Sequence, residues 1–558
     1  MKRGTQLVCL LLCAALLAGC VPAKQTEESV TAPDSSGAAV DFQSSPEPVL
    51  TEQALSEIKA LGESPDDNYR TWYEIFVYSF CDSDGDGIGD LQGVISKLDY
   101  LQNLGITGIW LMPIHPSTSY HKYNVSDYYA IDPDYGTMED FETLLAECEK
   151  RNIRVILDLV VNHTGSDHGW FREAVSYLQA LGDGEPDTAQ CPYFDYYNFT
   201  REAKNGYTQV PGMDWFYESQ FSPDMPDLNL DCPLARQEID AVMAFWLDKG
   251  VAGFRLDAAK EFHSGNADKN IEVLSWLQET AAAHRPDVYL VAEVWDAFST
   301  ITTFYQSGIT SIFDYPFGDS GGKIITVLRN AGNAGTVSTY AAALEKANAA
   351  YSGANPNYID APFLSNHDVG RIAGFCSGDA LKTKLAGAMN LFMSGSAFVY
   401  YGEEIGMVGS GSDPSKRAPM YWNAARDSGT TNPPPGCELP DSYPFGSLEE
   451  QAGDDTSVYN YYRQAIAIRS AIPAISHGQT TAETNLNKGC VSAFRKSCDL
   501  GECIVLMNID FSPAQVDLTG YEGWTLAAKL SADGNAITLD GAALTLPAFG
   551  TAVLVPAA

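Results

Sequence analysis

Eight short apolar segments, each followed by a helical pattern, constrain the fold of this chain more than any other feature. The segments occupy residues 73–80, 106–111, 153–161, 251–257, 287–294, 310–315, 361–366 and 396–401. They are almost continuously apolar, as strands of a parallel sheet covered on both faces must be. Helical patterns, for example over 140–150, 234–249 and 380–393, lie between them. Eight β-then-α units predict an α/β fold, a (β/α)8 TIM barrel.

Two stretches of the chain do not fit this repeat. Residues 164–233 follow the third predicted strand, and a connection longer than about 15 residues is usually functional or a small domain. After residue 475 the helical patterns end, and β-like runs follow at 503–509, 524–530 and 543–555. We therefore expect a catalytic barrel in two parts (69–163 and 234–475), an inserted domain after strand three (164–233) and a C-terminal antiparallel β-sandwich (476–558).

The first residues read as an export signal. Two basic residues precede an apolar run over 7–18, which is shorter than the roughly 20 helical residues that span a bilayer. The tetrad Leu17-Ala18-Gly19-Cys20 resembles the bacterial lipobox, in which cleavage before the cysteine leaves a lipid-modified N-terminus. We expect residues 1–19 to be a lipoprotein signal peptide and Cys20 to carry the lipid. The alternative is an ordinary signal peptide with an incidental cysteine.

The segment after Cys20 has the composition of a tether. Residues 21–49 are rich in Ser, Pro, Ala and Glu, with Phe42 as their single aromatic residue. We expect residues 20–68 to be a flexible, lipid-anchored tether that holds the protein on the outer face of a bacterial membrane, at the cell surface or in the periplasm.

The charge of the chain is strongly negative. There are 72 Asp and Glu against 34 Lys and Arg, a net charge of −38. Such a field repels phosphate backbones, so nucleic-acid binding is disfavoured and we expect no nucleic-acid partner; a neutral or cationic partner is favoured.

Polar residues gather at the ends of four predicted strands. In a TIM barrel the active site lies at the carboxyl ends of the strands. A single acidic residue there is more often a helix cap or half of a loop salt bridge, but a whole set predicts one active site. The set consists of His163, Arg255, Asp257, Glu293, His367 and Asp368.

These segments resemble the α-amylase superfamily of glycoside hydrolases (glycoside hydrolase family 13) over about residues 70–475. Further matches are GITGIWLMP at 105–113 and YYGEEIGM at 400–407. Retaining glycoside cleavage needs one carboxylate as nucleophile and a second carboxyl as proton donor. The resemblance implies that Asp257 is the nucleophile, Glu293 the acid/base and Asp368 the carboxylate that holds and distorts the sugar.

The resemblance also implies roles for six further residues. Arg255 would keep the nucleophile ionised, His163 and His367 would hydrogen-bond the same sugar, and Tyr123 would stack on it with His121 nearby. Lys260 would line the subsites of the leaving group.

A glycine-rich loop after the first predicted strand carries acidic residues at alternate positions. Hard oxygen ligands at this spacing suit Ca²⁺, but an EF-hand would need Glu at position 93, which is Gly. The loop resembles a calcium loop of oligo-1,6-glucosidase-like family members, and an acidic surface turn is the alternative. The predicted ligands of a structural Ca²⁺ are Asp82, Asp84, Asp86, the carbonyl of Ile88, and Asp90.

Two positions bear on the substrate. MPDLN at 225–229 resembles the intermediate group between oligo-1,6-glucosidases and neopullulanases, which acts mostly on starch and maltooligosaccharides. Asn124 stands where exo-acting α-glucosidases usually carry an Asp that holds the terminal sugar. We therefore expect a monomeric hydrolase that cleaves internal α-1,4 bonds of starch and maltooligosaccharides by retaining double displacement.

Two alternatives stay open. One is an exo-acting α-glucosidase or oligo-1,6-glucosidase, or a neopullulanase-like enzyme with transglycosylation. The other is a non-catalytic starch-binding lipoprotein, which would be expected to lack the nucleophile or the acid.

Overall fold

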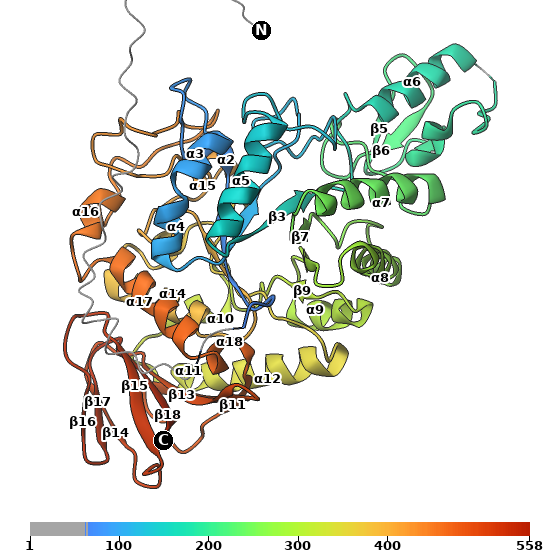
Figure 1. Cartoon of the computed structure of the whole chain (residues 1–558). Helices are drawn as coiled ribbons and strands as arrows, with labels where there is room; N and C mark the ends of the chain where they lie inside the picture. Colours follow the sequence, from blue (N-terminus) through green and yellow to red (C-terminus); the bar gives the residue numbers. More distant parts are fainter. Residues whose placement is uncertain (1–61, 63–64, 183, 558) are drawn as a thin grey trace, which may run out of the picture. The chain divides into compact units, whose positions relative to one another are not determined.

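The computed structural model describes residues 62, 65–182 and 184–557 (Figure 1). The predicted signal peptide, Cys20 and nearly all of the predicted tether lie outside these residues, so the lipid anchor stays a prediction. Among the helices described, none combines the length and the apolar character that a bilayer crossing requires.

Seven parallel strands form the central sheet, in the spatial order β10-β1-β2-β3-β7-β8-β9. Each pairs with its neighbour in parallel, and β1 pairs with both β2 and β10. The strands are β1 (Thr71–Ile75), β2 (Gly108–Leu111), β3 (Arg154–Leu159), β7 (Gly253–Leu256), β8 (Tyr289–Ala292), β9 (Ser311–Ile312) and β10 (Ala397–Tyr400).

The seventh predicted strand, 361–366, lies in the gap between β9 and β10. It is too irregular to count as a strand, but Phe313 and Ala361 form a parallel bridge. On one side Asp314 N donates to Ala361 O, and on the other Phe398 N donates to Pro362 O. The segment thus closes the sheet, which confirms the predicted TIM barrel.

The prediction of a strand over 73–80 is wrong in its second half. The chain leaves the sheet after Ile75, whose carbonyl accepts from Met112 N, and Val77–Phe80 form the short helix α2. The last pairs of β1 are Glu74 with Tyr400 and Ile75 with Leu111, so the aromatic run beyond them packs as a helical turn.

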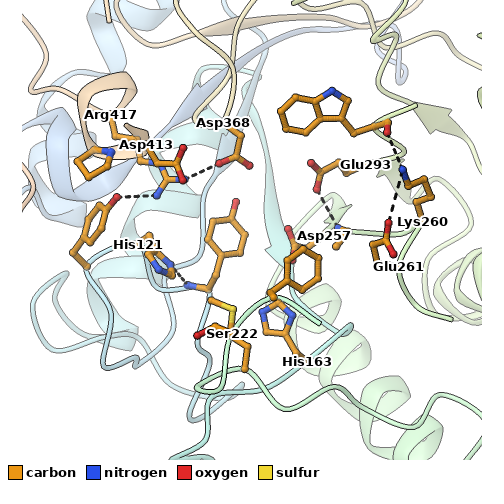
Figure 2. A pocket seen from close by; sticks show the side chains of 17 residues that line it. His121, His163, Ser222, Asp257, Lys260, Glu261, Glu293, Asp368, Asp413 and Arg417 are labelled. Atoms are coloured by element: carbon orange, nitrogen blue, oxygen red, sulfur yellow. Dashed lines mark hydrogen bonds and ion pairs between the residues drawn. The ribbon is translucent and has the colours of Figure 1, made fainter. Parts of the chain in front are cut away.

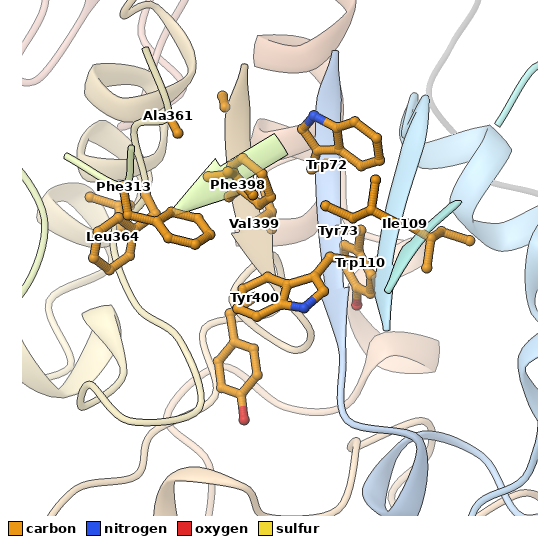
Figure 3. Packing of buried hydrophobic residues seen from close by; sticks show 14 of the residues in the cluster. Trp72, Tyr73, Ile109, Trp110, Phe313, Ala361, Leu364, Phe398, Val399 and Tyr400 are labelled. Atoms are coloured by element: carbon orange, nitrogen blue, oxygen red, sulfur yellow. The ribbon is translucent and has the colours of Figure 1, made fainter. Parts of the chain in front are cut away.

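Large side chains fill the barrel interior (Figure 3). The rings of Trp110 and Phe313 lie 5.4 Å apart, and those of Phe313 and Phe398 lie 4.9 Å apart. Trp72 lies across Gly108 on the adjacent strand, where an added Cβ would come within 2.3 Å of its ring. The barrel is therefore a packed core that supports the carboxyl ends of its strands.

Helices cover the outside of the sheet. The longer ones are α5 (Met138–Lys150), α7 (Pro233–Asp248), α8 (Ala267–His284), α9 (Phe298–Phe304), α10 (Lys323–Arg329), α12 (Thr339–Ala354), α14 (Ala380–Leu391) and α17 (Val458–Ala471), with α3 (Leu91–Ser96) and α4 (Leu98–Leu104) after β1. Short helical turns are α11 (Ala334–Val337), η2 (Tyr305–Ser307), α13 (Ile372–Phe375), α15 (Asp413–Lys416), α16 (Leu448–Ala452) and α18 (Ala474–His477).

The long connection after β3 has secondary structure of its own. It begins with α6 (Gly169–Leu181) and η1 (Pro192–Tyr196), and then forms a small antiparallel sheet in the order β4-β6-β5. The three strands are Phe199–Thr200 (β4), Phe216–Glu218 (β6) and Tyr207–Gln209 (β5). This agrees with an inserted domain after strand three, whose exact limits stay a prediction.

The C-terminal part consists of two antiparallel sheets. The larger has the order β11-β12-β13-β18-β15 and the smaller β14-β17-β16. Apolar side chains from both sheets, among them Ile504, Leu544 and Leu554, pack into a core of their own, as expected of a β-sandwich. The strands are β11 (Gln479–Ala482), β12 (Val491–Cys498), β13 (Gly501–Asn508), β14 (Ala514–Asp517), β15 (Trp524–Leu530), β16 (Thr538–Asp540), β17 (Ala543–Leu546) and β18 (Thr551–Pro556).

Candidate active site

A cavity of about 850 Å³ opens at the carboxyl ends of the barrel strands (Figure 2). Segments far apart in the sequence line it, including the loop after β2, the inserted domain and the loop after β10. Seven of the predicted site residues line it: His121, Tyr123, His163, Asp257, Lys260, Glu293 and Asp368. The other two, Arg255 and His367, are buried against these residues.

The two carboxylates predicted to perform catalysis share one guanidinium. Arg255 Nη1 lies 2.6 Å from Asp257 Oδ1, and its Nη2 lies 2.6 Å from Glu293 Oε2. A third carboxylate, Asp158, accepts from the same Nη1 at 2.8 Å. One positive charge cannot balance three buried negative charges, so at least one carboxyl must keep its proton.

Burial determines how these carboxyls titrate. Burial, opposed by Arg255 and reinforced by Asp257 and Asp368, raises the pKa of Glu293. Burial likewise raises the pKa of Asp257 against the effect of Arg255, and it raises the pKa of Asp158 to about 7. A protonated Glu293 beside an Asp257 held by Arg255 is the arrangement that acid-assisted attack on a glycoside requires.

Asp368 lies in the opposite electrostatic environment. Its Oδ1 lies 2.7 Å from Arg417 Nη2, and its Oδ2 lies 3.0 Å from His367 Nε2. Although burial opposes the shift, His367 and Arg417 lower the pKa of Asp368. This carboxylate therefore stays ionised and can accept hydrogen bonds from sugar hydroxyls.

Tyr123 connects the two groups of carboxylates. Its hydroxyl lies 2.7 Å from His367 Nε2 and donates to Asp158 Oδ2 at 3.0 Å. Its ring lines the cavity and lies parallel to the ring of His367, with 5.5 Å between the centroids. These contacts hold the ring face at the cavity wall, and its stacking on a sugar stays a prediction.

The two predicted histidine ligands on the cavity wall are neutral. Burial lowers the pKa of His163 to about 4, and burial together with Arg417 lowers that of His121 to about 4. Among the described residues, His163 Nε2 has no hydrogen-bond partner although it is buried. An unpaired nitrogen on a cavity wall is suited to a ligand hydroxyl.

The cavity wall carries two exposed aromatic residues that the sequence did not predict. Trp295 is 45% exposed and Phe221, from the inserted domain, is 51% exposed. Lys260 Nζ donates to Trp295 O at 3.2 Å, whereas the ring of Phe221 lies 5.5 Å from that of His163. Exposed aromatic faces in a cavity are suited to stacking on sugar rings.

Asn124 follows the cavity-lining Tyr123 in a buried position, and the expectation that its identity disfavours exo-cleavage stays a prediction. Asn124 itself does not line the cavity, and its amide donates to Asp224 O at 3.3 Å. Tyr120, four residues earlier, lines the cavity instead, and its hydroxyl accepts from Arg417 Nη1 at 3.0 Å.

The predicted metal loop brings three of its acidic residues together. Carboxylate oxygens of Asp82, Asp84 and Asp86 all lie within 4.8 Å of one another. Asp90 instead caps α3, where its Oδ1 accepts from Gly93 N at 2.7 Å. The amide of Ile88 donates to Asp86 Oδ1 at 2.7 Å, which holds the loop in a tight turn.

Known proteins resemble this chain over most of its length. The model of the α-amylase catalytic domain matches residues 74–478. "Alpha-amylase 3" of Dictyoglomus thermophilum is 42% identical over 412 residues, which are 73% of this chain and 78% of that protein. "Oligo-1,6-glucosidase" of Parageobacillus thermoglucosidasius is 28% identical over 486 residues, 73% of this chain and 84% of that protein.

A solved structure covers more of the chain. Eubacterium rectale Amy13B superposes with a TM-score of 0.87 at 42% identity, over 92% of this chain and 100% of that chain. The barrel, the carboxylates at its strand ends and these matches lead to one conclusion: this chain belongs to the α-amylase family of glycoside hydrolases.

Proposed function

We propose that this protein is an endo-acting hydrolase that cleaves internal α-1,4 bonds of starch and maltooligosaccharides. The observation that carries the proposal is the extent of the cavity on both sides of the catalytic carboxylates. Lys260 and Glu261 line it on the side of Glu293, and Arg417 and Asp413 line it on the side of Asp368 (Figure 2). A cavity that continues on both sides of the catalytic carboxylates suits an internal segment of a polymer, whereas an exo-acting enzyme needs one end blocked.

The chemistry follows the positions of the carboxyls. Glu293 donates its proton to the glycosidic oxygen while Asp257 attacks the anomeric carbon, so the bond to the leaving sugar breaks as a glycosyl ester forms. Glu293, now ionised, then takes a proton from water, which attacks the same carbon and releases Asp257. Family membership supports this retaining sequence, and Arg255 stabilises the negative charge on Asp257 when the ester breaks.

We further propose that the loop over 82–90 holds a structural Ca²⁺. Three carboxylates within 4.8 Å of one another, of which only Asp82 is buried, offer the hard oxygen donors that this ion prefers. Bound Ca²⁺ would neutralise the repulsion among them and so fix the loop. Since Asp90 caps α3, the remaining ligands would be the predicted Ile88 carbonyl and water.

The location at the outer face of a bacterial membrane, through a lipid on Cys20, is also a proposal. Its support is the sequence of the first 49 residues. Mass spectrometry of the protein from membranes tests it: a diacylated or triacylated Cys20 is expected, and an unmodified Cys20 contradicts it.

Product analysis over time tests the proposed activity. With residues 21–558 we expect early mixed maltooligosaccharides from soluble starch and no cleavage of maltose. Glucose as the sole early product indicates the exo-acting alternative, and panose from pullulan indicates the neopullulanase-like one. No product from starch, pullulan or maltose supports the non-catalytic binding protein.

A further inference from the structure

A buried glutamate on β1, Glu74, contacts the catalytic machinery from below. It is 1% exposed, and in the sheet register it lies between Trp110 on β2 and Tyr400 on β10. Its Oε1 lies 2.6 Å from His367 Nδ1 and accepts from His367 N at 3.3 Å. No role follows for it from the steps described above.

His367 therefore lies between two carboxylates. Glu74 faces its Nδ1, and Asp368 Oδ2 lies 3.0 Å from its Nε2. A neutral imidazole has a hydrogen on one nitrogen, so the lone pair of the other would point at a carboxylate. Both contacts are hydrogen bonds if both imidazole nitrogens carry hydrogen. They are also hydrogen bonds if the proton between Glu74 and Nδ1 resides on Glu74 and the hydrogen of the neutral ring is on Nε2. In either case Nε2 donates toward Asp368.

The hydrogen bonds of Tyr123 agree with this assignment. Its hydroxyl lies 2.7 Å from His367 Nε2, and it also receives Arg255 Nη1 at 3.3 Å. Because its own hydrogen is donated to Asp158 Oδ2 at 3.0 Å, the Tyr123 oxygen is an acceptor toward Nε2. This, too, requires a hydrogen on Nε2.

We propose that Glu74 is a positioning residue that keeps a hydrogen on His367 Nε2, and thereby keeps Asp368 ionised and oriented toward the sugar. The proposal rests on the proposed hydrolase activity. Glu74 touches no substrate, because it lies beneath His367 and does not line the cavity.

Several charged groups face this pair. Glu74 and Asp368 flank His367 directly, and Asp158 and Asp257 act on it from β3 and β7. Arg255 opposes them from β7, and from the loop after β10 Arg417 Nε donates to His367 O at 3.0 Å. His121, on the loop after β2, is neutral. Burial alone would lower the pKa of His367, but Asp368 and Glu74 raise it to about 9.

Glu74→Gln tests the proposal. Gln keeps the size, and because the His367 N–H also donates to Oε1, the amide oxygen faces His367 and accepts from Nδ1. Since the charge is removed, Nε2 loses its hydrogen as pH rises. If the pKa of His367 returns to about 6.5, the ratio of wild-type to variant kcat rises from about 1.3 at pH 6 to about 4 at pH 7 and about 30 at pH 8. A ratio that stays constant over this range overturns the proposal. This ratio cancels the ionisation of Glu293, which both proteins share.

A matched control separates positioning from folding. Glu404 is equally buried, and its Oε1 accepts from Tyr73 at 2.9 Å, away from His367. Glu404→Gln is expected to lower the Tm without a pH-dependent kcat ratio. If it reproduces the pH dependence of Glu74→Gln, the effect of Glu74 is merely structural and the proposal fails.

A measurement on the unaltered protein does not depend on the folding of Glu74→Gln. The chain has eight histidines, and NMR of ¹³C- and ¹⁵N-labelled imidazoles, with the His367 signal assigned by its loss in His367→Asn, reports the hydrogen on each nitrogen. We expect a hydrogen on Nε2 of His367 up to pH 8. A bare Nε2 at pH 7 overturns the proposal, whereas the absence of starch hydrolysis by the wild type overturns the proposed function instead.

Discussion

Trp295 offers a quantitative test of how the cavity binds its substrate. Its ring lies on Tyr315 with 5.2 Å between centroids and an angle of 13° between the planes. Tyr315 in turn donates to Glu293 Oε1 at 3.2 Å. One face of the indole is thus covered by protein, and the other is free for a sugar on the leaving-group side of Glu293.

The exposed area sets the expected loss on replacement by alanine. With 45% of the residue exposed and about 250 Å² for a tryptophan, roughly 110 Å² is open to a sugar. If a sugar ring covers half to all of this area at about 25 cal/mol per Å², the contact contributes about 1.4 to 2.7 kcal/mol. Trp295→Ala should therefore lower kcat/KM about 10- to 100-fold.

Steady-state kinetics on maltooligosaccharides of increasing length measures this loss. The loss should be large for substrates that reach beyond Glu293, and Trp295→Phe should retain most of the activity. As a control, Phe511→Ala removes an aromatic ring that is 56% exposed in the C-terminal part, outside the cavity, and should leave kcat/KM unchanged. A folded Trp295→Ala with kcat/KM within twofold of the wild type on long substrates refutes the reasoning.

Three further predictions concern the carboxylates. Asp257→Asn should lower starch hydrolysis on the order of 10⁴-fold, with the Tm and glucan binding retained, because it removes the nucleophile and leaves the cavity; reducing-sugar release at the wild-type rate contradicts this. Because burial raises the pKa of Glu293, kcat/KM should fall as pH rises through that pKa and the acid loses its proton. A pH profile of Glu293→Gln that keeps the same alkaline limb would show that another group is the acid. Chelation should lower the Tm, measured by calorimetry, and added Ca²⁺ should restore it. Asp82→Asn should abolish this response, whereas the control Asp99→Asn, at an exposed position, should keep it. A Tm that does not change on chelation excludes the metal.

The barrel could be predicted because its strands are buried on both faces and therefore remain apolar throughout. The errors occur where pairing ends: the apolar run 73–80 continues beyond Ile75, the last paired residue of β1, and 361–366 pairs too irregularly to form a regular strand. A run of apolar residues indicates burial, but it does not indicate where the hydrogen bonds between neighbouring strands end.

The site residues that lie within the family's motifs could be predicted from the sequence. Glu74 and Arg417 were not predicted as site residues because neither lies in a segment that the motifs mark. Their importance comes from contacts with His367 and Asp368 that form on folding. Phe221 lies in the inserted domain, where no periodic pattern distinguishes a cavity wall from a solvent-exposed face. Asp90 fits the spacing of a metal ligand, but the same side chain can cap the next helix.

The most direct test of the account is to trap the covalent intermediate. A fluorinated maltosyl fluoride, which forms the glycosyl ester faster than water releases it, would be incubated with the protein and the labelled peptide sequenced by mass spectrometry. We expect one maltosyl group on Asp257 and none in Asp257→Asn. A label on another carboxylate, or starch hydrolysis without any label, would contradict the assignment of Asp257 as the nucleophile of a retaining hydrolase.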